Sequence, residues 1–456
     1  MKMKLPKSLL QVGVLSLSLL ATGVMAAVPA SEAAKLGTTL TPMGAEMAGN
    51  ADKSIPAWSP MPTNIGAVDS KGFLANPYAN EQPLFVITAQ NVDKYKDKLA
   101  PGQYAMFKRY PDTFKMPVYP SHRGATVPAE VLAAIKNNAT KTNLVGGGNG
   151  LENFETAVPF PIPKDGTEVI WNHITRYRGG SVSRLVTQAT PQTNGSYSLV
   201  YFSDQFVFRD KMKDFDPKNP GNILFYFKQE VTAPARLAGS VLLVHETLDQ
   251  VKEPRAAWVY NAGQRRVRRA PQVSYDGPGT AADGLRTSDN LDMYNGAPDR
   301  YDWKLIGKQE LYIAANSYKL DDPKIKYADI LKAGHINQDL ARYELRRVWH
   351  VTATLKEGQR HIYAKRDFFI DEDTWQAAII DQYDGRGQLW RVSEAHAENY
   401  YDKQVPWYAL EVIYDLQSGR YLALGMKNEE KRAYDFGFTA TISDFQPNSL
   451  RQEGVR

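Results

Sequence analysis

A chain of 456 residues with 43% hydrophobic and 23% charged side chains can bury a large core, so an intrinsically disordered protein is excluded. The formal charge of +5 falls to +2 once the three lysines of residues 1–26 are set aside, a balance that argues against general affinity for nucleic acid. The sequence contains no cysteine, so it can form no disulfide and carry no acylated cysteine.

The first 26 residues have the pattern of a secretory signal peptide. Lys2, Lys4 and Lys7 precede an apolar run at residues 9–24, and small residues stand before Ala27. The run is short for a membrane span, and no later stretch approaches the roughly 20 apolar residues that a span needs. We therefore expect a soluble protein of the Gram-negative periplasm, cleaved just before Ala27.

Residues 27–165 form an irregular and partly helical N-terminal region. Prolines recur through residues 27–83, which predicts an extended segment lying over a surface. Short helices are expected at residues 88–99, 102–110 and 128–138. The glycine-rich stretch after them lacks the Lys-Ser/Thr of a phosphate loop and a preceding strand, which favours a plain loop over a nucleotide site.

From residue 166 to the C-terminus the pattern changes to β-strands. Runs rich in β-branched and aromatic residues are bounded by Gly, Pro or Asp, and short turns join several of them directly. Those runs span residues 168–178, 196–208, 222–233, 239–251, 304–314, 342–356, 361–371, 375–384, 389–400, 408–416 and 421–426. The pattern predicts a mainly β (α+β) protein with one large antiparallel sheet that curls, its concave side capped by helices 88–99 and 128–138.

A hairpin and a long loop interrupt this meander. Residues 256–260 and an arginine-rich return strand, 265–269, flank an Asn-Ala-Gly-Gln turn. About thirty residues without a strand pattern follow at 271–302, a length typical of a functional loop or lid. Four apolar lid residues stand among its glycines and acids: Leu285, Leu291, Met293 and Tyr294. We expect the loop to fold over an apolar opening while its polar residues face water.

Four motifs give this chain a resemblance to a known family: PVYPSHR at residues 117–123, VPFPIPKDGTEVIWNHITRYRG at 158–179, the hairpin with its loop at 254–302, and RHIYAKRDFFIDEDTWQ at 360–376. It resembles an uncharacterised periplasmic family often labelled outer-membrane lipoprotein-sorting proteins, by similarity to the carrier and receptor of the Lol system. The resemblance implies a LolA/LolB-like half-open antiparallel barrel around a hydrophobic cavity that carries acyl chains. It implies no catalytic residues, and it is compatible with an inner-membrane transporter or an outer-membrane receptor as partner.

A dry groove lined by apolar side chains binds an acyl chain without catalysis, since each buried methylene contributes about 0.8 kcal/mol. Aromatic and aliphatic residues of the strand runs are the candidate lining of such a cavity. They are Trp171, Phe225, Phe227, Leu243, Trp258, Tyr260, Leu311, Trp349, Phe369 and Trp390. Alternation alone does not say which face is concave, and a conventional filled core explains each residue equally well.

The arginines of the return strand have two interpretations. Arg265, Arg266, Arg268 and Arg269 would hold a phosphate or carboxylate head group at the cavity mouth. Alternatively they pair with acids of the following loop. These acids are Asp276, Asp283, Asp289 and Asp292, and their spacing does not match an EF-hand, so turn and cap roles are favoured over calcium binding.

No catalytic motif emerges, and no cofactor or metal is expected. The seven histidines include no HExxH, and no GxSxG elbow exists. His245 and Glu246 are adjacent in a strand, where side chains point to opposite faces. Three hypotheses stand in order: a monomeric periplasmic carrier of lipids or lipoprotein acyl chains, a non-carrier accessory protein of a resistance-nodulation-division-type transporter, and a hydrolase or lyase with a dispersed site.

Overall fold

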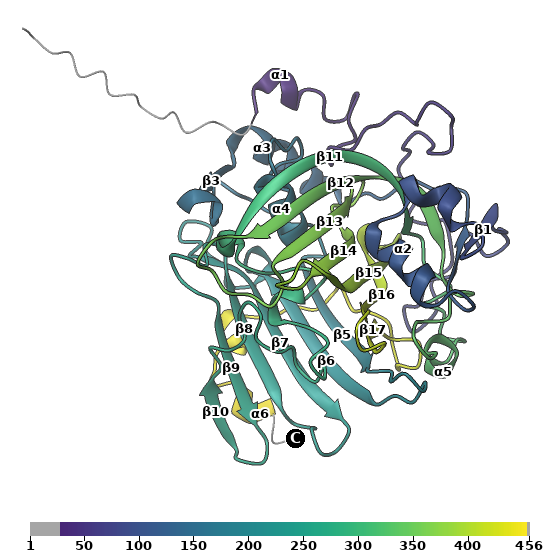
Figure 1. The fold of residues 1–456 in the computed structure, drawn as a ribbon. Helices are drawn as coiled ribbons and strands as arrows, with labels where there is room; N and C mark the ends of the chain where they lie inside the picture. Colours follow the sequence, from purple (N-terminus) through teal and green to yellow (C-terminus); the bar gives the residue numbers. More distant parts are fainter. Residues whose placement is uncertain (1–27, 454–456) are drawn as a thin grey trace, which may run out of the picture.

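One large, strongly curled sheet dominates the computed structural model, which describes residues 28–453 (Figure 1). The segment predicted to be a signal peptide lies outside these residues. Its 15 strands run in the order β1-β2-β12-β13-β14-β15-β16-β17-β5-β6-β7-β8-β9-β10, with β11 paired to β12. The strands are β1 Phe85–Thr88, β2 Lys115–Val118, β5 Ser181–Ala189, β6 Leu199–Phe208, β7 Ile223–Ala233, β8 Val241–Thr247, β9 Ala256–Asn261, β10 Arg266–Arg269, β11 Tyr301–Ala314, β12 Tyr343–Leu355, β13 Lys365–Asp371, β14 Ala377–Tyr383, β15 Leu389–Tyr400, β16 Val405–Asp415 and β17 Tyr421–Met426.

Two antiparallel meanders make up this sheet. Strands β5–β10 form the first and β11–β17 the second, and β17 pairs with β5 to join them. The sheet stays open, because its ends, β1 and β10, do not pair with each other. A single parallel contact between Tyr343 and Val118 attaches the short N-terminal hairpin β1–β2. The prediction of a mainly β fold with one large curled sheet is confirmed.

The inner face of the sheet, defined here as the face that packs against helix α4 (Gly166–Thr175), carries the largest apolar core. Side chains from both meanders meet there, among them Phe206, Phe225, Phe368 and Trp407. Helix α3 (Ala129–Lys141) contributes Val131 and Ile135 to the same core. The expectation that helix 128–138 caps the concave side therefore agrees with the structure.

The strand predicted at residues 168–178 is wrong, because this segment forms α4. Asp165 begins the helix, its carboxylate accepting hydrogen bonds from the backbone N–H groups of Thr167 at 2.8 Å and Glu168 at 3.0 Å. All residues of α4 except Thr167 are buried. A helix surrounded by protein is apolar on every side, so its β-branched and aromatic composition resembled that of a strand.

The outer face is covered by other segments. The 3-10 helix η1 (Val92–Lys98), α2 (Pro101–Arg109) and α5 (Tyr327–Ile330) bury apolar side chains against β11–β17. The C-terminal segment, with η6 (Ile442–Phe445) and α6 (Leu450–Glu453), covers β7–β10. Helix 88–99 was expected on the concave side, and this is wrong: Val92 and Leu99 enter the outer core because their neighbours on the chain, β1 and β2, join the sheet from that side.

The remaining elements are short. Helix α1 (Ala30–Ala33) and isolated bridges are the regular structure in the proline-rich stretch up to residue 83. Strands β3 (Asn143–Val145) and β4 (Gly150–Glu152) form a small hairpin around η2 (Gly146–Gly148), so the glycine-rich stretch is a turn. The helices η3 (Arg209–Lys211), η4 (Ser288–Asn290) and η5 (Pro298–Arg300) lie in connections. Within residues 28–453, no helix is both long and apolar enough to span a membrane.

Candidate functional site

The loop between β10 and β11 enters the inner face of the sheet and divides into two parts. We call residues 287–300 the anchor and residues 271–286 the flap. In the anchor, Met293 and Tyr294 belong to the inner core, and Asp289 and Asp292 are also buried. The expectation that the polar residues of this loop face water is therefore wrong for the anchor, where buried basic groups satisfy them.

Buried ion pairs fix the anchor. Arg176 Nη2 donates to Asp292 Oδ1 at 2.6 Å, and Arg178 contacts the other oxygen of the same carboxylate. Burial alone would raise the pKa of Asp292, but the positive charges of Arg176 and Arg178 outweigh it and hold this pKa well below its usual range. Because removing one partner of a buried pair is costly, the anchor is a permanent part of the fold.

A second pair holds the anchor to β13. Arg366 Nη2 donates to Asp289 Oδ2 at 2.7 Å, and His361 Nε2 lies 3.0 Å from the same oxygen. Burial opposes ionisation of Asp289, yet the charge of Arg366 and the hydrogen bond with His361 lower its pKa well below the usual range. Asp289 and Asp292 therefore serve as counter-ions of buried basic groups.

The flap is held by weaker contacts. Gln188 Nε2 donates to the backbone oxygen of Ala281 at 2.7 Å, and Arg391 Nη2 donates to that of Gly284 at 2.7 Å. Asp283 pairs with Arg420 at the surface, where its side chain remains 60% exposed. Since exposed pairs contribute about 0–1 kcal/mol, the flap is attached far less firmly than the anchor.

Two small pockets lie between the flap and the inner face of the first meander. One is lined by Phe227, Leu242, Val244, Val273 and Gly279, and its volume is about 40 Å³. The other, of similar volume, lies over β5, β6 and β17. Both are lined by Gln229, Arg286 and Leu291, so they meet at these side chains. Each has room for a few water molecules, far less than the roughly 300 Å³ of a typical ligand site.

Arg286 stands at the junction of the two pockets. Its side chain is buried, with 8% of the residue exposed, its Nε has no hydrogen-bond partner, and its guanidinium forms no ion pair within 4 Å among the described residues. A Cβ atom at Gly279 would lie 2.8 Å from Arg286 Nε, so glycine at this position leaves space for the guanidinium. Burial lowers the pKa of Arg286, although Glu411 opposes the shift.

The acids around Arg286 are already occupied or neutral. Arg184 Nη2 donates to Asp204 Oδ2 at 2.8 Å, and Gln229 donates to the other oxygen at 3.1 Å. Burial raises the pKa of Glu411 to about 8, with repulsion from Asp292 as a further cause, so Glu411 is mostly protonated at pH 7.

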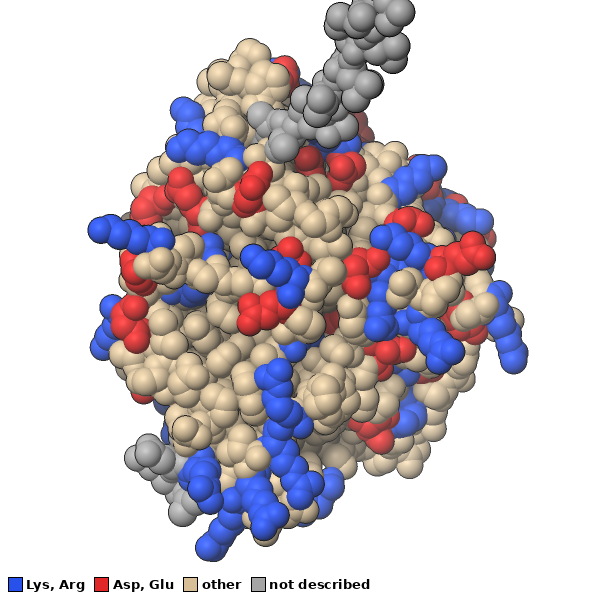
Figure 2. All heavy atoms as spheres, turned by 90° about the vertical axis from the view of Figure 1, so that its left-hand side faces the viewer, with Lys and Arg blue, Asp and Glu red and all other residues tan. Residues whose placement is uncertain are grey.

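Arginines of the return strand form an exposed edge. Arg266, Arg268 and Arg269 are exposed on β10, the last strand of the sheet, and Arg265 lies in the preceding turn. Figure 2 shows Lys and Arg side chains gathered at the lower end of the face where Figure 1 places β9 and β10. Arg269 lies over the ring of Trp258, 4.7 Å from its centroid.

The predicted pairing of these arginines with acids of the loop is wrong. Asp283 pairs with Arg420, whereas Asp289 and Asp292 pair with basic groups of other segments. Asp276 accepts from the backbone of Ile362 at 3.1 Å. The strand direction of β10 carries its arginines along the sheet edge while the loop turns into the interior, so the two sets separate.

The ten candidate cavity residues do not share one surface. Strand alternation places Phe225 and Phe227 on the inner face, where Trp171 and Trp349 also pack. Leu243, Trp258 and Tyr260 pack on the outer face against the C-terminal segment, and Leu311 and Phe369 belong to the outer core of the second meander. Trp390 is half-buried beside Tyr363. The prediction of a common wall is wrong for Leu243, Trp258, Tyr260, Leu311 and Phe369.

Of the four lid residues, three are buried: Leu285, Met293 and Tyr294. Leu285 lies in the flap and packs with Ile413 and Leu422, whereas Met293 and Tyr294 belong to the anchor. Leu291 lines both pockets from the anchor side. Arg286 and Gly279 were not predicted, since one arginine in a loop gives no sequence signal of being buried and unpaired.

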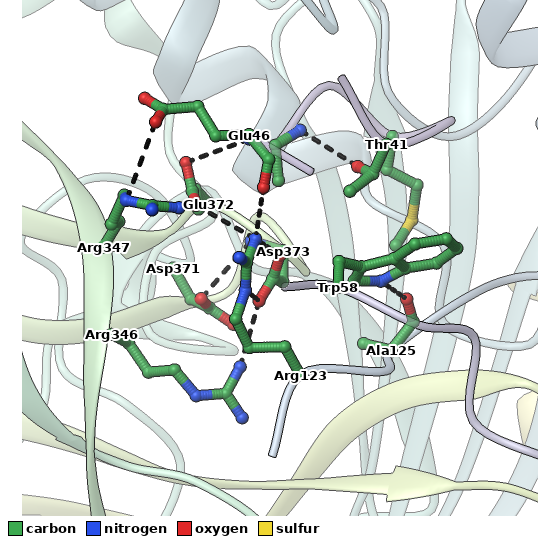
Figure 3. Close-up of polar contacts among 12 residues, drawn as sticks. Thr41, Glu46, Trp58, Arg123, Ala125, Arg346, Arg347, Asp371, Glu372 and Asp373 are labelled. Carbon is green, nitrogen blue, oxygen red and sulfur yellow. Dashed lines mark hydrogen bonds and ion pairs between the residues drawn. The ribbon is translucent and has the colours of Figure 1, made fainter. Parts of the chain in front are cut away.

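A buried ionic cluster fastens the N-terminal segment over the second meander (Figure 3). Arg123 donates to Asp373 through Nε at 2.9 Å and Nη2 at 2.8 Å, and to the backbone oxygen of Glu46 at 2.6 Å. Arg346 joins the cluster through an ion pair with Asp373, at an N–O distance of 3.0 Å, and Arg347 joins it through an ion pair with Glu372. Burial and repulsion from Asp373 raise the pKa of Asp371, beside them, to about 7. These groups satisfy one another, so the cluster is structural.

The histidines do not converge on one point. His173 is buried between the backbone oxygens of Trp375 and Asp292, and burial lowers its pKa to about 3. His245 contacts the oxygen of Phe445 on the outer face, whereas Glu246 pairs with Arg255 inside, which confirms that the two point to opposite faces. Among residues 28–453, no group of three or more His, Asp or Glu side chains is arranged to hold a metal ion.

Comparison with solved structures found distant likenesses. A putative outer membrane lipoprotein-sorting protein domain from Vibrio parahaemolyticus is 12% identical, with a TM-score of 0.42 over 60% of this chain and 92% of that one. A DUF1329 family protein from Desulfovibrio piger is 13% identical, with a TM-score of 0.38 over 59% and 91%. The LolA superfamily protein NE2245 from Nitrosomonas europaea is 13% identical, with a TM-score of 0.38 over 63% and 100%.

Sequence comparison is more direct. Over 455 residues the chain is 78% identical to the uncharacterized protein PA3922 of Pseudomonas aeruginosa, covering 100% of both chains. The model of one family, described as "Protein of unknown function (DUF1329)", matches residues 86–451. This match confirms the resemblance to an uncharacterised family that was drawn from the sequence motifs. The chain therefore belongs to the DUF1329 family.

Proposed function

We propose that this protein is a periplasmic carrier that binds a lipid, a lipoprotein acyl chain or a similar ligand on the inner face of its sheet, beneath the flap. The observation that carries the proposal is the unequal attachment of one loop. Residues 287–300 are fixed by buried ion pairs, whereas residues 271–286 lie over two small pockets and are held to the sheet by hydrogen bonds to their backbone and by an exposed ion pair.

The closed pockets are too small for an acyl chain, so binding requires the flap to move outward. Displacing it breaks the contacts of Gln188 and Arg391 with its backbone and uncovers Ala282 and Leu285. Each methylene that enters the uncovered groove contributes about 0.8 kcal/mol, so a chain of a dozen carbons offsets the loss of these few contacts. The fixed anchor keeps the inner core closed while this happens.

Closing the flap covalently tests the proposal. The sequence contains no cysteine, so the substitutions Asp283→Cys and Arg420→Cys would introduce the only two thiols of the protein. Both wild-type side chains reach the surface. A short bis-maleimide linker across this pair would hold the flap down. We expect binding of a fluorescent fatty acid by delipidated protein to weaken at least about tenfold, or to become correspondingly slower, since the ligand must enter beneath the flap.

A matched control uses the exposed ion pair of Lys326 and Glu429, which lies away from the pocket linings. Lys326→Cys and Glu429→Cys, joined by the same linker, should bind the probe like the wild type. Equal binding by the flap-linked and control-linked proteins would refute the assigned role of the flap. Absence of probe binding by every delipidated protein would refute the carrier function.

A further inference from the structure

We infer that Arg286 binds the single negative charge of a long-chain carboxylate, whose hydrocarbon chain lies along the inner face of the first meander. This inference rests on the proposed function and specifies the class of ligand for the same site. Arg286 lies within the family motif at 254–302, but the motif by itself assigns it no role. Three features of its surroundings support the assignment: its position, its missing partner and the charge balance around it.

The position of Arg286 suits a head-group anchor. It lines both pockets where they meet, and the rest of the shared lining is Gln229 and Leu291. On one side the walls continue with Phe227, Leu242 and Val244, and on the other with Val186, Phe202 and Leu424. An anion at the guanidinium therefore has apolar side chains on either side, interspersed with polar ones, along which a hydrocarbon chain can extend.

Arg286 differs from the other buried arginines of the inner face in having no acidic partner. Buried arginines elsewhere on the inner face are paired: Arg176 and Arg178 with Asp292, and Arg184 with Asp204. Arg286 has the same burial without such a partner among residues 28–453. Because an unpaired buried charge is costly, a carboxylate that accepts both hydrogen bonds of the guanidinium edge would gain a strong, bidentate interaction.

The charge balance selects a monoanion. Asp204 is neutralised by Arg184, and Glu246 by Arg255. Among the charged residues that line the two pockets, one positive charge, that of Arg286, is therefore left over, and Glu411 beside it is mostly protonated at pH 7. A carboxylate compensates this charge, whereas a phosphate monoester with nearly two negative charges would place an uncompensated charge in a buried site beside Asp204.

The test compares a fatty acid with its uncharged ester. cis-Parinaric acid and its methyl ester are both fluorescent, and delipidated full-length mature protein would be titrated with each. We expect the wild type to bind the acid about 10- to 100-fold more tightly than the ester, the range expected for a buried charge-assisted hydrogen bond. Arg286→Gln and Arg286→Met should lose this preference through weaker binding of the acid, while binding of the ester stays within about twofold.

The exposed Arg266→Gln variant is the matched control, since it removes the same charge from the sheet edge. It should keep the preference for the acid at 150 mM salt, where exposed charges are largely screened. Thermal melting of Arg286→Met at or above the wild-type temperature would show that the variant folds and that the removed charge was unpaired.

The outcomes separate the two proposals. Equal binding of acid and ester by the wild type, or an unchanged preference in both Arg286 variants, would overturn the role of Arg286 and leave the carrier function standing. Loss of the preference in Arg266→Gln instead would place the anion at the sheet edge and also overturn it. If the wild type binds neither probe, the carrier function and the inference fail together. Tighter binding of hexadecyl phosphate than of palmitate would overturn the choice of a monoanion.

Discussion

Replacing Asp292 by Asn should loosen the anchor of the loop without changing its shape. The substitution removes the shared counter-ion of Arg176 and Arg178, two buried guanidinium groups. Arg176 keeps the oxygens of His173 and Gln376, each at 2.7 Å, and Arg178 keeps the oxygen of Ile174 at 2.9 Å, so their hydrogen bonding is only partly lost. Breaking one member of a buried pair costs about 3–5 kcal/mol, and we expect a loss of unfolding free energy in this range.

Urea denaturation followed by tryptophan fluorescence measures this loss, because Trp407 Nε1 donates to Asp292 Oδ1 at 3.3 Å and reports on the site. The matched control is Asp283→Asn in the flap, whose carboxylate pairs with Arg420 at the surface. This control should cost less than about 1 kcal/mol. A loss for Asp292→Asn no larger than that of Asp283→Asn would refute the division into anchor and flap.

The pH dependence of the same variant gives an independent check. The pKa of Asp292 is lowered in the folded protein, so below about pH 4, where the unfolded carboxyl takes up protons, the unfolded state binds more protons than the folded one. The contribution of Asp292 is therefore complete above about pH 4 and declines as the pH falls further. The stability difference between wild type and Asp292→Asn should shrink in that acid range and stay constant from pH 5 to 7.

Three further predictions concern other residues. Because burial raises the pKa of Glu411 to about 8, the folded protein keeps a proton on this carboxyl that the unfolded chain releases. Measured by urea denaturation between pH 5 and 8, Glu411→Gln should therefore gain about 1 kcal/mol of stability relative to wild type for each pH unit. A stability difference that does not change with pH would contradict this. Trp258→Asp on the outer face should leave fatty-acid binding by the folded fraction unchanged, whereas Phe227→Asp in the pocket wall should weaken it at least about tenfold; the reverse order would place the ligand on the other face. N-terminal sequencing of protein from the periplasm should begin at Ala27, and thiol reductant should not change its melting temperature; an intact N-terminus would disprove processing at that position.

The strands were the predictable part of the fold. In most of them apolar residues alternate with polar ones or form a continuous apolar run, and clear turns mark both ends. Strand β5 was missed for a physical reason. On the inner face of β5, the polar residues Arg184 and Gln188 interrupt the row of apolar side chains from which a strand is predicted. Arg184 forms an ion pair with Asp204 where that pattern expects an apolar contact. Helix α4 was mistaken for a strand because burial on all sides removes the polar stripe that identifies a surface helix.

The candidate site was less predictable, since it depends on contacts between distant segments. The loop was recognised from its length and composition, but its acids find partners at Arg176, Arg178 and Arg366, which no local spacing indicates. Burial cannot be inferred for a charged residue without knowing its counter-ion. The unpaired state of Arg286 is a property of the assembled sheet and flap, so it becomes visible only in three dimensions.

The ionic cluster around Arg123 has a consequence for the order in which the chain folds. Arg123 precedes its partners Glu372 and Asp373 by 249 and 250 positions. A chain that emerges from a ribosome or a translocation channel N-terminus first must therefore hold its first third undocked until the first three strands of the second meander, β11–β13, have followed. Contacts of such high sequence separation form slowly and late. The N-terminal segment can therefore close over the sheet only after β13 has been made, although it is the first part of the chain to be synthesised.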